Sequence, residues 1–201
     1  NGATRDALLL NIGGGMITDL GGFVAATYMR GIRCVNIPTS LLAMVDASTG
    51  GKTGINILGL KNLVGTFTQP AATLIYPPFL NTLSENEILS GYAEMLKHGL
   101  IADPAHFYAL LAIELQMPYS ELFAPLLSDS IQVKRQIVSA DFQEKGLRKA
   151  LNFGHTIGHA IEESYAVQGR TVAHGYCVLW GMVAELYLSV IKMGCPRNVL
   201  T

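Results

Sequence analysis

The stretch that decides the fold is Ala7-Leu8-Leu9-Leu10-Asn11-Ile12-Gly13-Gly14-Gly15, an apolar run that ends in a glycine turn. A helical pattern follows from Leu20 to Met29. A strand, a glycine turn and a helix together aim backbone N–H groups at an anion. The Rossmann fingerprint is incomplete, because Thr18 stands where its third glycine is expected. We therefore expect a pyrophosphate-binding turn here, with a plain glycine turn as the alternative.

A second strand is predicted over Cys34 to Ile37, followed by a loop and a short helix up to Ser48. Strand–helix–strand alternation indicates a parallel α/β sheet, in which ligands bind beyond the carboxyl ends of the strands. Thr39 and Ser40 lie at such an end. Thr73 to Ile75 is the third strand candidate.

Gly50-Gly51-Lys52-Thr53 is similar to the end of a P-loop, but Asp46 replaces its first glycine and no strand precedes it. We reject a P-loop and expect a hairpin instead. Its two lysines, Lys52 and Lys61, and its Asn62 stand among glycines, which suits the binding of a phosphate or a carbonyl group.

The double proline Pro77-Pro78 is the best domain boundary, and the chain becomes helical after it. Ser84 and Glu87 form a candidate capping box for a helix up to about Leu100. We divide the chain into a partial α/β domain, residues 1–83, and a partial helical domain, residues 84–201.

Glu94, Lys97 and His98 lie at positions i, i+3 and i+4 of that helix, among apolar neighbours. A buried glutamate needs a cation or a metal, although an exposed Glu94–Lys97 salt bridge is the alternative. His106 is interpreted as an ordinary surface histidine.

Leu151 to Glu163 contains His155 and His159, one helical turn apart on the same face. This spacing commonly offers two imidazoles to one metal ion, and a pair of core histidines is the alternative. His174-Gly175 precedes the last helix, which is predicted to end at Gly194.

The composition excludes several classes of protein. The 201 residues carry 14 Lys+Arg and 15 Asp+Glu, a net charge of −1, so we expect neither nucleic acid nor membrane as a partner. The three cysteines form no disulfide framework and suit a reducing compartment. The chain begins at Asn1, and we expect it to be a piece of a longer protein.

Taken together, these motifs resemble the 3-dehydroquinate synthase family, from about Ala7 to Met182. The resemblance is carried by Gly13–Gly31, Ile37–Asp46, Gly50–Asn56, Lys61-Asn62, Glu94–Gly99 and Leu151–Glu162. It implies an α/β, Rossmann-like NAD-binding domain followed by an α-helical metal-binding domain. It also implies a cytoplasmic homodimer.

The implied activity is that of a lyase of the shikimate pathway, which leads to the aromatic amino acids. The substrate DAHP is converted to 3-dehydroquinate with release of phosphate. In the family NAD is reduced and reoxidised within one turnover, and a divalent metal, Zn²⁺ or Co²⁺, holds and acidifies the hydroxyl that is oxidised.

The resemblance also assigns residues to roles. The implied metal ligands are Glu94, His155 and His174, and His159 is then a proton-transfer group beside the reacting hydroxyl. Residues matching the substrate positions are Lys52, Asn62, Lys97, Lys134, Arg148, Asn152 and, toward the neighbouring subunit, Arg30. Residues matching NAD positions are Gly15, Met16, Ile17, Thr18, Asp19, Thr39, Ser40, Asp46, Lys52, Lys61, Phe79, Leu80, Asn81 and Thr82.

Two departures from the family pattern stand out: Tyr176-Cys177 replaces a frequent Glu-Ala after His174-Gly175, and Tyr76 replaces a usual aspartate. The family's outer strands and final helices would lie beyond this stretch, so we expect these residues alone to bind NAD poorly and turn over little. Three alternatives stay open: another sugar phosphate cyclase, a metal-dependent polyol dehydrogenase of the same superfamily, or an inactive truncated remnant.

Overall fold

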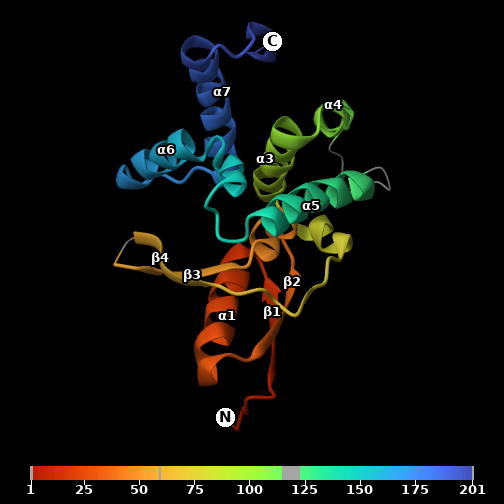
Figure 1. Ribbon diagram of the computed structural model, residues 1–201, viewed down its shortest axis with the longest axis vertical. Coiled ribbons are helices and arrows are strands. Elements are labelled where there is room, and N and C mark those ends of the chain that lie inside the picture. The colour runs from red at the N-terminus through yellow and green to blue at the C-terminus, as the bar shows by residue number, and fades with distance from the viewer. Residues whose placement is uncertain (1, 59, 115–122, 201) are drawn as a thin grey trace.

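The computed structural model describes residues 2–58, 60–114 and 123–200, without the side chains of residues 60 and 61. The chain forms a mixed α/β fold in which helices predominate. The strands and helix α1 lie toward one end of the molecule, and helices α3 to α7 lie toward the other (Figure 1).

A small parallel sheet has the strand order β1-β2-β5, with β1 at Leu8–Gly13, β2 at Arg33–Pro38 and β5 at Ala72–Thr73. The predicted strand, glycine turn and helix are confirmed, because α1 at Gly15–Thr27 follows β1 directly. The third strand is shorter and begins earlier than predicted, since only Ala72 and Thr73 pair with β2.

The face of the sheet that α1 covers is held by a polar contact. Asn11 of β1 donates a hydrogen bond to Asn36 of β2 over 2.8 Å, and both side chains are buried. Gly21 of α1 makes the close approach possible, because a Cβ there would lie 1.9 Å from Asn11 Oδ1. A buried pair of amides thus fixes the register beneath the helix.

The expected hairpin is confirmed as the antiparallel pair of β3, Lys52–Ile57, and β4, Leu60–Phe67. Lys52 begins a strand here, whereas the lysine of a P-loop opens a helix, which agrees with the rejection of a P-loop. The hairpin packs against α1.

Short helices connect the two ends of the molecule: α2 at Leu41–Val45, η2 at Ala47–Thr49 and η3 at Pro77–Thr82. The core contains α2 and η3 packed against the next helices, through buried Leu41, Met44, Leu80, Met95 and Phe123. This shared core joins the α/β part to the helical part, and the boundary predicted at residue 83 stays a prediction.

The helical part contains α3 at Glu85–Ala102, α4 at Pro104–Ala112, α5 at Phe123–Ala140, η4 at Leu147–Asn152, α6 at His155–Val167, α7 at His174–Met193 and η5 at Arg197–Leu200. The capping box of Ser84 and Glu87 at the start of α3 is confirmed, as is Gly194 at the end of α7.

His106 differs from the sequence interpretation, because it is buried rather than on the surface. Its Nε2 lies 2.8 Å from Ser130 Oγ of α5, a partner 24 residues further along the chain.

By length and composition alone, α7 could cross a membrane, a test that core helices of soluble proteins also pass. In the fold it packs on α6 and α3. The expectation that no membrane is involved stays a prediction.

Candidate metal centre and anion-binding cavity

Helix α3 carries three fully buried polar side chains, Glu94, Lys97 and His98. Lys97 pairs with the Glu94 Oε2 atom inside this helix. The Glu94–Lys97 salt bridge is therefore a buried pair and not the exposed one that was the alternative. Burying such an ion pair costs free energy of desolvation unless neighbouring groups also interact with it, and this cost points to a functional site around it.

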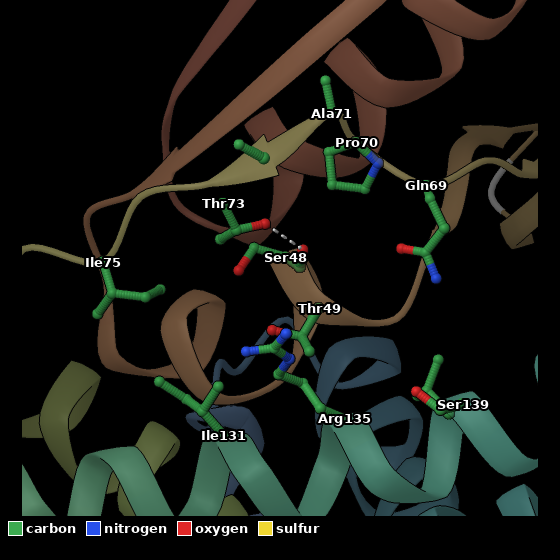
Figure 2. A pocket seen from close by; sticks show the side chains of 12 residues that line it. Ser48, Thr49, Gln69, Pro70, Ala71, Thr73, Ile75, Ile131, Arg135 and Ser139 are labelled. Carbon is green, nitrogen blue, oxygen red and sulfur yellow. Dashed lines mark hydrogen bonds between the residues drawn. The ribbon is translucent and has the colours of Figure 1, made fainter.

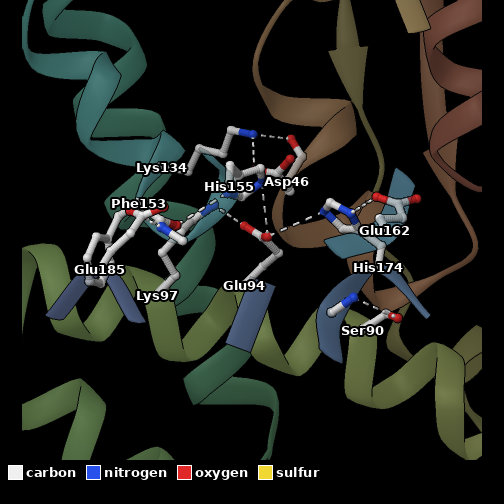
Figure 3. Close-up of polar contacts among 12 residues, drawn as sticks. Asp46, Ser90, Glu94, Lys97, Lys134, Phe153, His155, Glu162, His174 and Glu185 are labelled. Atoms are coloured by element: carbon white, nitrogen blue, oxygen red, sulfur yellow. Dashed lines mark hydrogen bonds and ion pairs between the residues drawn. The ribbon is translucent and has the colours of Figure 1, made fainter. Parts of the chain in front are cut away.

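Two imidazoles face Glu94 from two other helices, and a third, that of His159, lies beside them. His155 Nε2 at the start of α6 lies 3.5 Å from Glu94 Oε1, and His174 Nε2 at the start of α7 lies 3.9 Å from the same oxygen. The rings of His155 and His159 are 5.2 Å apart, and those of His155 and His174 are 5.4 Å apart. Figure 3 shows His155 and His174 on either side of the Glu94 carboxylate.

The donor set suits a divalent cation. Glu94 Oε1 is buried and has no hydrogen-bond partner among the described residues, although its neighbours are imidazole nitrogens. One ring nitrogen from each of His155, His159 and His174 lies within 4.8 Å of the others. Burial, followed by the nearby Lys97 charge, lowers the pKa of His155, which keeps this imidazole neutral and able to bind a metal. A carboxylate oxygen and neutral imidazoles form a donor set that zinc accepts.

Glu162 supports this arrangement from α6, because its Oε2 lies 3.2 Å from His174 Nδ1. A carboxylate on one ring nitrogen orients the ring and leaves Nε2 to face the cluster. Glu162 belongs to the histidine motif, but nothing in that motif predicted its contact with a residue across the loop.

A second carboxylate–histidine group, Asp46, Glu94 and His98, also has its donor atoms within 4.8 Å. Two ammonium groups already occupy its carboxylates, because Lys134 pairs with Asp46 and Lys97 pairs with Glu94. Both ring nitrogens of His98 lack a hydrogen-bond partner among the described residues. Burial and the Lys97 charge lower the pKa of His98 to about 3, so this ring stays neutral. The competing lysines make this group a weaker candidate for a metal.

Next to the histidines lie two connected hollows with volumes of about 560 Å³ and 80 Å³. They share five lining residues: Asp46, Lys52, Lys134, Glu144 and Arg148. Asn62 lines the larger hollow, whereas Lys97, Asn152 and His155 line the smaller one. The structure thus brings together every sequence-predicted substrate residue except Arg30.

Internal contacts position the cationic side chains of these hollows. Lys134 donates a hydrogen bond to the Asp46 backbone carbonyl over 2.7 Å and pairs with its carboxylate. Arg148 donates to the carbonyl oxygens of Phe142 and Gly50 over 2.6 and 2.7 Å. Because carbonyls rather than carboxylates hold its guanidinium, the charge of Arg148 remains available to an anion.

Burial would raise the pKa of Asp46, but the Lys134 and Lys97 charges outweigh it and hold that pKa below its usual range. Burial lowers the pKa of Lys134, and the negative charge of Asp46 partly opposes this lowering. Asp46 therefore remains an anion in contact with Lys134, and this ion pair forms part of the wall of the hollow.

Glu144 is a residue of these hollows that sequence reasoning missed. It pairs with Lys52 and accepts a hydrogen bond from Asn152 Nδ2 over 2.6 Å. It lies in the turn after α5, and no sequence motif marks it. Glu144 connects the hairpin lysine to the asparagine that precedes the histidine helix.

The residues predicted for NAD form a more open region. Gly15 to Asp19 make the first turn of α1, where Thr18 is buried and Met16 is 77% exposed. Asp19 lines both the larger hollow and a neighbouring one of about 480 Å³ that Met16 and Asn62 also line. Burial, and then the Asp46 charge, raise the pKa of Asp19 to about 6.

Other predicted NAD residues have local structural roles. The Thr39 amide donates to the Gly13 carbonyl over 3.0 Å, and the Ser40 hydroxyl caps α2. Phe79, Leu80, Asn81 and Thr82 form part of η3, with Leu80 fully buried. The side chain of Lys61 lies outside the described residues. Arg30 is exposed in the short 3-10 helix η1, Tyr28–Arg30, which follows α1, and it lines neither substrate hollow.

A separate hollow of about 390 Å³ lies between α5 and the segment that leads into β5 (Figure 2). Among its described lining residues Arg135 is the one that carries a charge, and it points from α5 toward Thr49 and Ser48. These same lining residues include no carboxylate, thiol or imidazole, so they offer no group for acid–base chemistry.

Comparison with known proteins agrees with this arrangement. The family profile described as 3-dehydroquinate synthase N-terminal matches residues 1–90, and the profile described as 3-dehydroquinate synthase C-terminal matches residues 91–200. The chain belongs to the 3-dehydroquinate synthase family.

The curated relatives of this family are substantially similar in sequence. The 3-dehydroquinate synthase of Parabacteroides distasonis is 52% identical over 201 residues, which is all of this chain and 57% of that protein. The 3-dehydroquinate synthase of Streptococcus pneumoniae is 50% identical over 203 residues, covering 98% of this chain and 56% of that protein. The chain therefore spans a little over half the length of these relatives.

Solved structures share the fold. The 2-epi-5-epi-valiolone synthase from Streptomyces hygroscopicus subsp. jinggangensis, with NAD⁺ and Zn²⁺ bound, matches with a TM-score of 0.87 and 32% identity, over 99% of this chain and 56% of that one. A 2-deoxy-scyllo-inosose synthase matches with a TM-score of 0.82 at 24% identity, over 98% of this chain and 53% of that one. The fold is thus that of the dehydroquinate synthase-like sugar phosphate cyclases.

Proposed function

We propose that this chain carries the metal and substrate residues of a 3-dehydroquinate synthase, which converts DAHP to 3-dehydroquinate and phosphate. The observation that carries the proposal is the buried Glu94 Oε1, without a hydrogen-bond partner among the described residues, facing His155 and His174 beside hollows lined by lysine and arginine. Family membership and the identity of 52% to a named synthase support the same activity.

Glu94, His155 and His174 would hold the metal, Zn²⁺ or Co²⁺. When bound, such an ion acidifies a substrate hydroxyl and polarises the carbonyl that replaces it. His159 would then serve as the proton-transfer group, because its ring lies 5.2 Å from that of His155 and its side chain is exposed to the solvent side of the cluster.

Lys97, Lys134 and Arg148 would bind the carboxylate and phosphate of the substrate, with Lys52, Asn62 and Asn152 on its hydroxyls. Their grouping around shared hollows supports these roles. Because Lys97 and Lys134 are buried, their charges act in a medium that screens them weakly. Lys97 and Lys134 already pair with Glu94 and Asp46, so they would share their charges between these carboxylates and the substrate, whereas the charge of Arg148 would be fully available to it.

NAD would lie along the first turn of α1, at Gly15 to Asp19. The valiolone synthase that shares this fold has NAD⁺ bound, which supports a cofactor site in this chain. Thr39, Ser40, Asp46, Lys61 and the segment 79–82 remain proposed contacts. Weak NAD binding by this chain, a cytoplasmic location and a homodimer that uses Arg30 also stay predictions.

The test is a chimera in which these 201 residues replace the matching segment of the Parabacteroides distasonis relative. We expect phosphate release from DAHP with catalytic NAD and no net NADH, and we expect His155→Ala to abolish it. Net NADH formation would instead favour a polyol dehydrogenase. A chimera that binds metal and NAD but releases no phosphate from DAHP would contradict the proposal.

A further inference from the structure

Helices α6 and α7 approach each other with almost no side chain between them. A Cβ on Gly181 of α7 would lie 2.0 Å from the Gly154 carbonyl oxygen, and one on Gly158 of α6 would lie 2.8 Å from the Cys177 carbonyl oxygen. Only glycine fits at these two positions, so the backbones meet directly. The start of α6, which carries His155, is therefore within reach of side chains on α7.

Glu185 of α7 uses this proximity. Its Oε2 accepts a hydrogen bond from the Gly154 amide over 2.8 Å, and its Oε1 accepts one from the Ile157 amide over 3.3 Å. Figure 3 shows Glu185 beside Phe153, at the end of the cluster that His155 occupies. The two amides flank His155 in the chain, so one carboxylate holds the backbone on both sides of it.

Helix α6 has no cap of its own. The residue at its N-cap is Gly154, whose φ is +79° and which has no side chain to accept from the first amides. The first amides of a helix otherwise remain without partners, and buried ones destabilise the fold. A carboxylate at a helix start also interacts favourably with the positive end of the helix dipole. Glu185 of α7 supplies the capping carboxylate that the residues at the start of α6 lack.

The geometry points to Glu185 as a positioning residue that holds His155 in place to bind the metal ion. This inference rests on the proposed metal site. Together with Glu162, which contacts His174 Nδ1 from α6, it completes a reciprocal arrangement. Each of the two helices supplies a carboxylate that fixes the histidine end of the other.

The test is Co²⁺ titration of the chain, followed by its visible d–d absorption, for wild type, Glu185→Gln and the control Glu163→Gln. Glutamine keeps one acceptor oxygen but presents an NH₂ group to the second amide. Glu163 is exposed on α6, so its variant controls for the lost charge. Outer-shell changes typically weaken metal affinity about 10- to 100-fold, and we expect about tenfold with an altered spectrum for Glu185→Gln alone.

Hydrogen exchange of the metal-free protein provides a readout that does not depend on metal. We expect faster exchange at the Gly154 and Ile157 amides in Glu185→Gln, with the wild-type circular dichroism retained at the measurement temperature. Glu185→Asp, whose shorter side chain withdraws the carboxylate, is a second variant with the same expectations.

Each outcome has a distinct meaning. Faster exchange with unchanged Co²⁺ affinity and spectrum would make Glu185 a structural cap only and would overturn the inference. Exchange and affinity both equal to those of Glu163→Gln would overturn it as well. A wild-type chain that binds no Co²⁺ would overturn the proposed metal site itself, and the role of Glu185 with it.

Discussion

In the helical part, Glu94, Lys97 and His98 are fully buried and surrounded by side chains from other helices, whereas in the α/β part the first turn of α1 is open and Met16 is 77% exposed. The comparison teaches that the groups proposed for metal and substrate are preorganised by packing within this chain. The NAD groups proposed on the first turn of α1 lie in a more open region, although Thr18 is buried. Changes should therefore have the largest effects at the buried groups and smaller ones at groups whose partners face solvent.

The largest effect is expected for Glu94→Ala. Removing this carboxylate leaves Lys97 as an uncompensated charge in a fully buried position. Breaking a buried ion pair in this way typically costs about 3–5 kcal/mol of unfolding free energy. Urea unfolding of the metal-free protein measures it, with the exposed Glu163→Ala as the control. A loss below about 1 kcal/mol would mean that Lys97 finds another partner.

Next in size is the contrast between His155→Ala and His159→Ala. We expect the first to weaken Zn²⁺ binding by more than the roughly 10- to 100-fold typical of outer-shell changes. The second should leave the affinity nearly unchanged but abolish phosphate release in the chimera. Chelator competition measures the affinities. Equal losses of Zn²⁺ affinity in both variants would contradict the proposal that His155 is a metal ligand and His159 is not.

A smaller effect is expected at the boundary of the two regions, for Asp19→Asn. The pKa of Asp19 is raised from 3.8 to about 6, so protonation is favoured in the folded state. Its contribution to stability is present below pH 3.8 and is lost as the pH rises through about 6. Wild type should therefore lose roughly 1–2 kcal/mol relative to the variant between about pH 4 and 7, after allowance for solvent screening. Urea unfolding at several pH values checks this, and parallel curves would contradict it.

The smallest effect is expected for Glu144→Gln, because its partner Lys52 is 49% exposed. Pairs that face solvent contribute about 0–1 kcal/mol, so the free energy of unfolding should change by no more than that. A loss of unfolding free energy above about 2 kcal/mol would contradict this and show that the Glu144–Lys52 pair behaves as a buried ion pair.

Local patterns predicted much of this fold. The apolar run before Gly13 predicted a strand, the Ser84–Glu87 pair predicted a helix start, and the stretch from Gly54 to Asn62 predicted a hairpin. Each of these elements formed. The grouping of Glu94, Lys97 and His98 could also be predicted from local sequence, because helical spacing alone puts these residues on one face.

What the sequence could not supply depends on contacts between distant segments. His106 is buried and hydrogen-bonded to Ser130, and Glu185 accepts hydrogen bonds from amides 31 and 28 residues away. Glu144, after α5, pairs with Lys52 of the hairpin strand β3. Nothing in the neighbouring residues marks these partners, because the distances arise only when α5, α6 and α7 pack. The short β5 has a similar origin, since only two of its residues reach β2.

The most direct test of the division between His155 and His159 is X-ray absorption spectroscopy of the Zn²⁺-loaded chain. The proposed ligand set predicts two imidazole ligands, from His155 and His174, with the remaining ligands oxygen atoms at about 2.0–2.2 Å, one of them from Glu94. The His159→Ala variant should give the same spectrum. A wild-type spectrum with three imidazoles, reduced to two in His159→Ala, would contradict the assignment and make His159 a metal ligand.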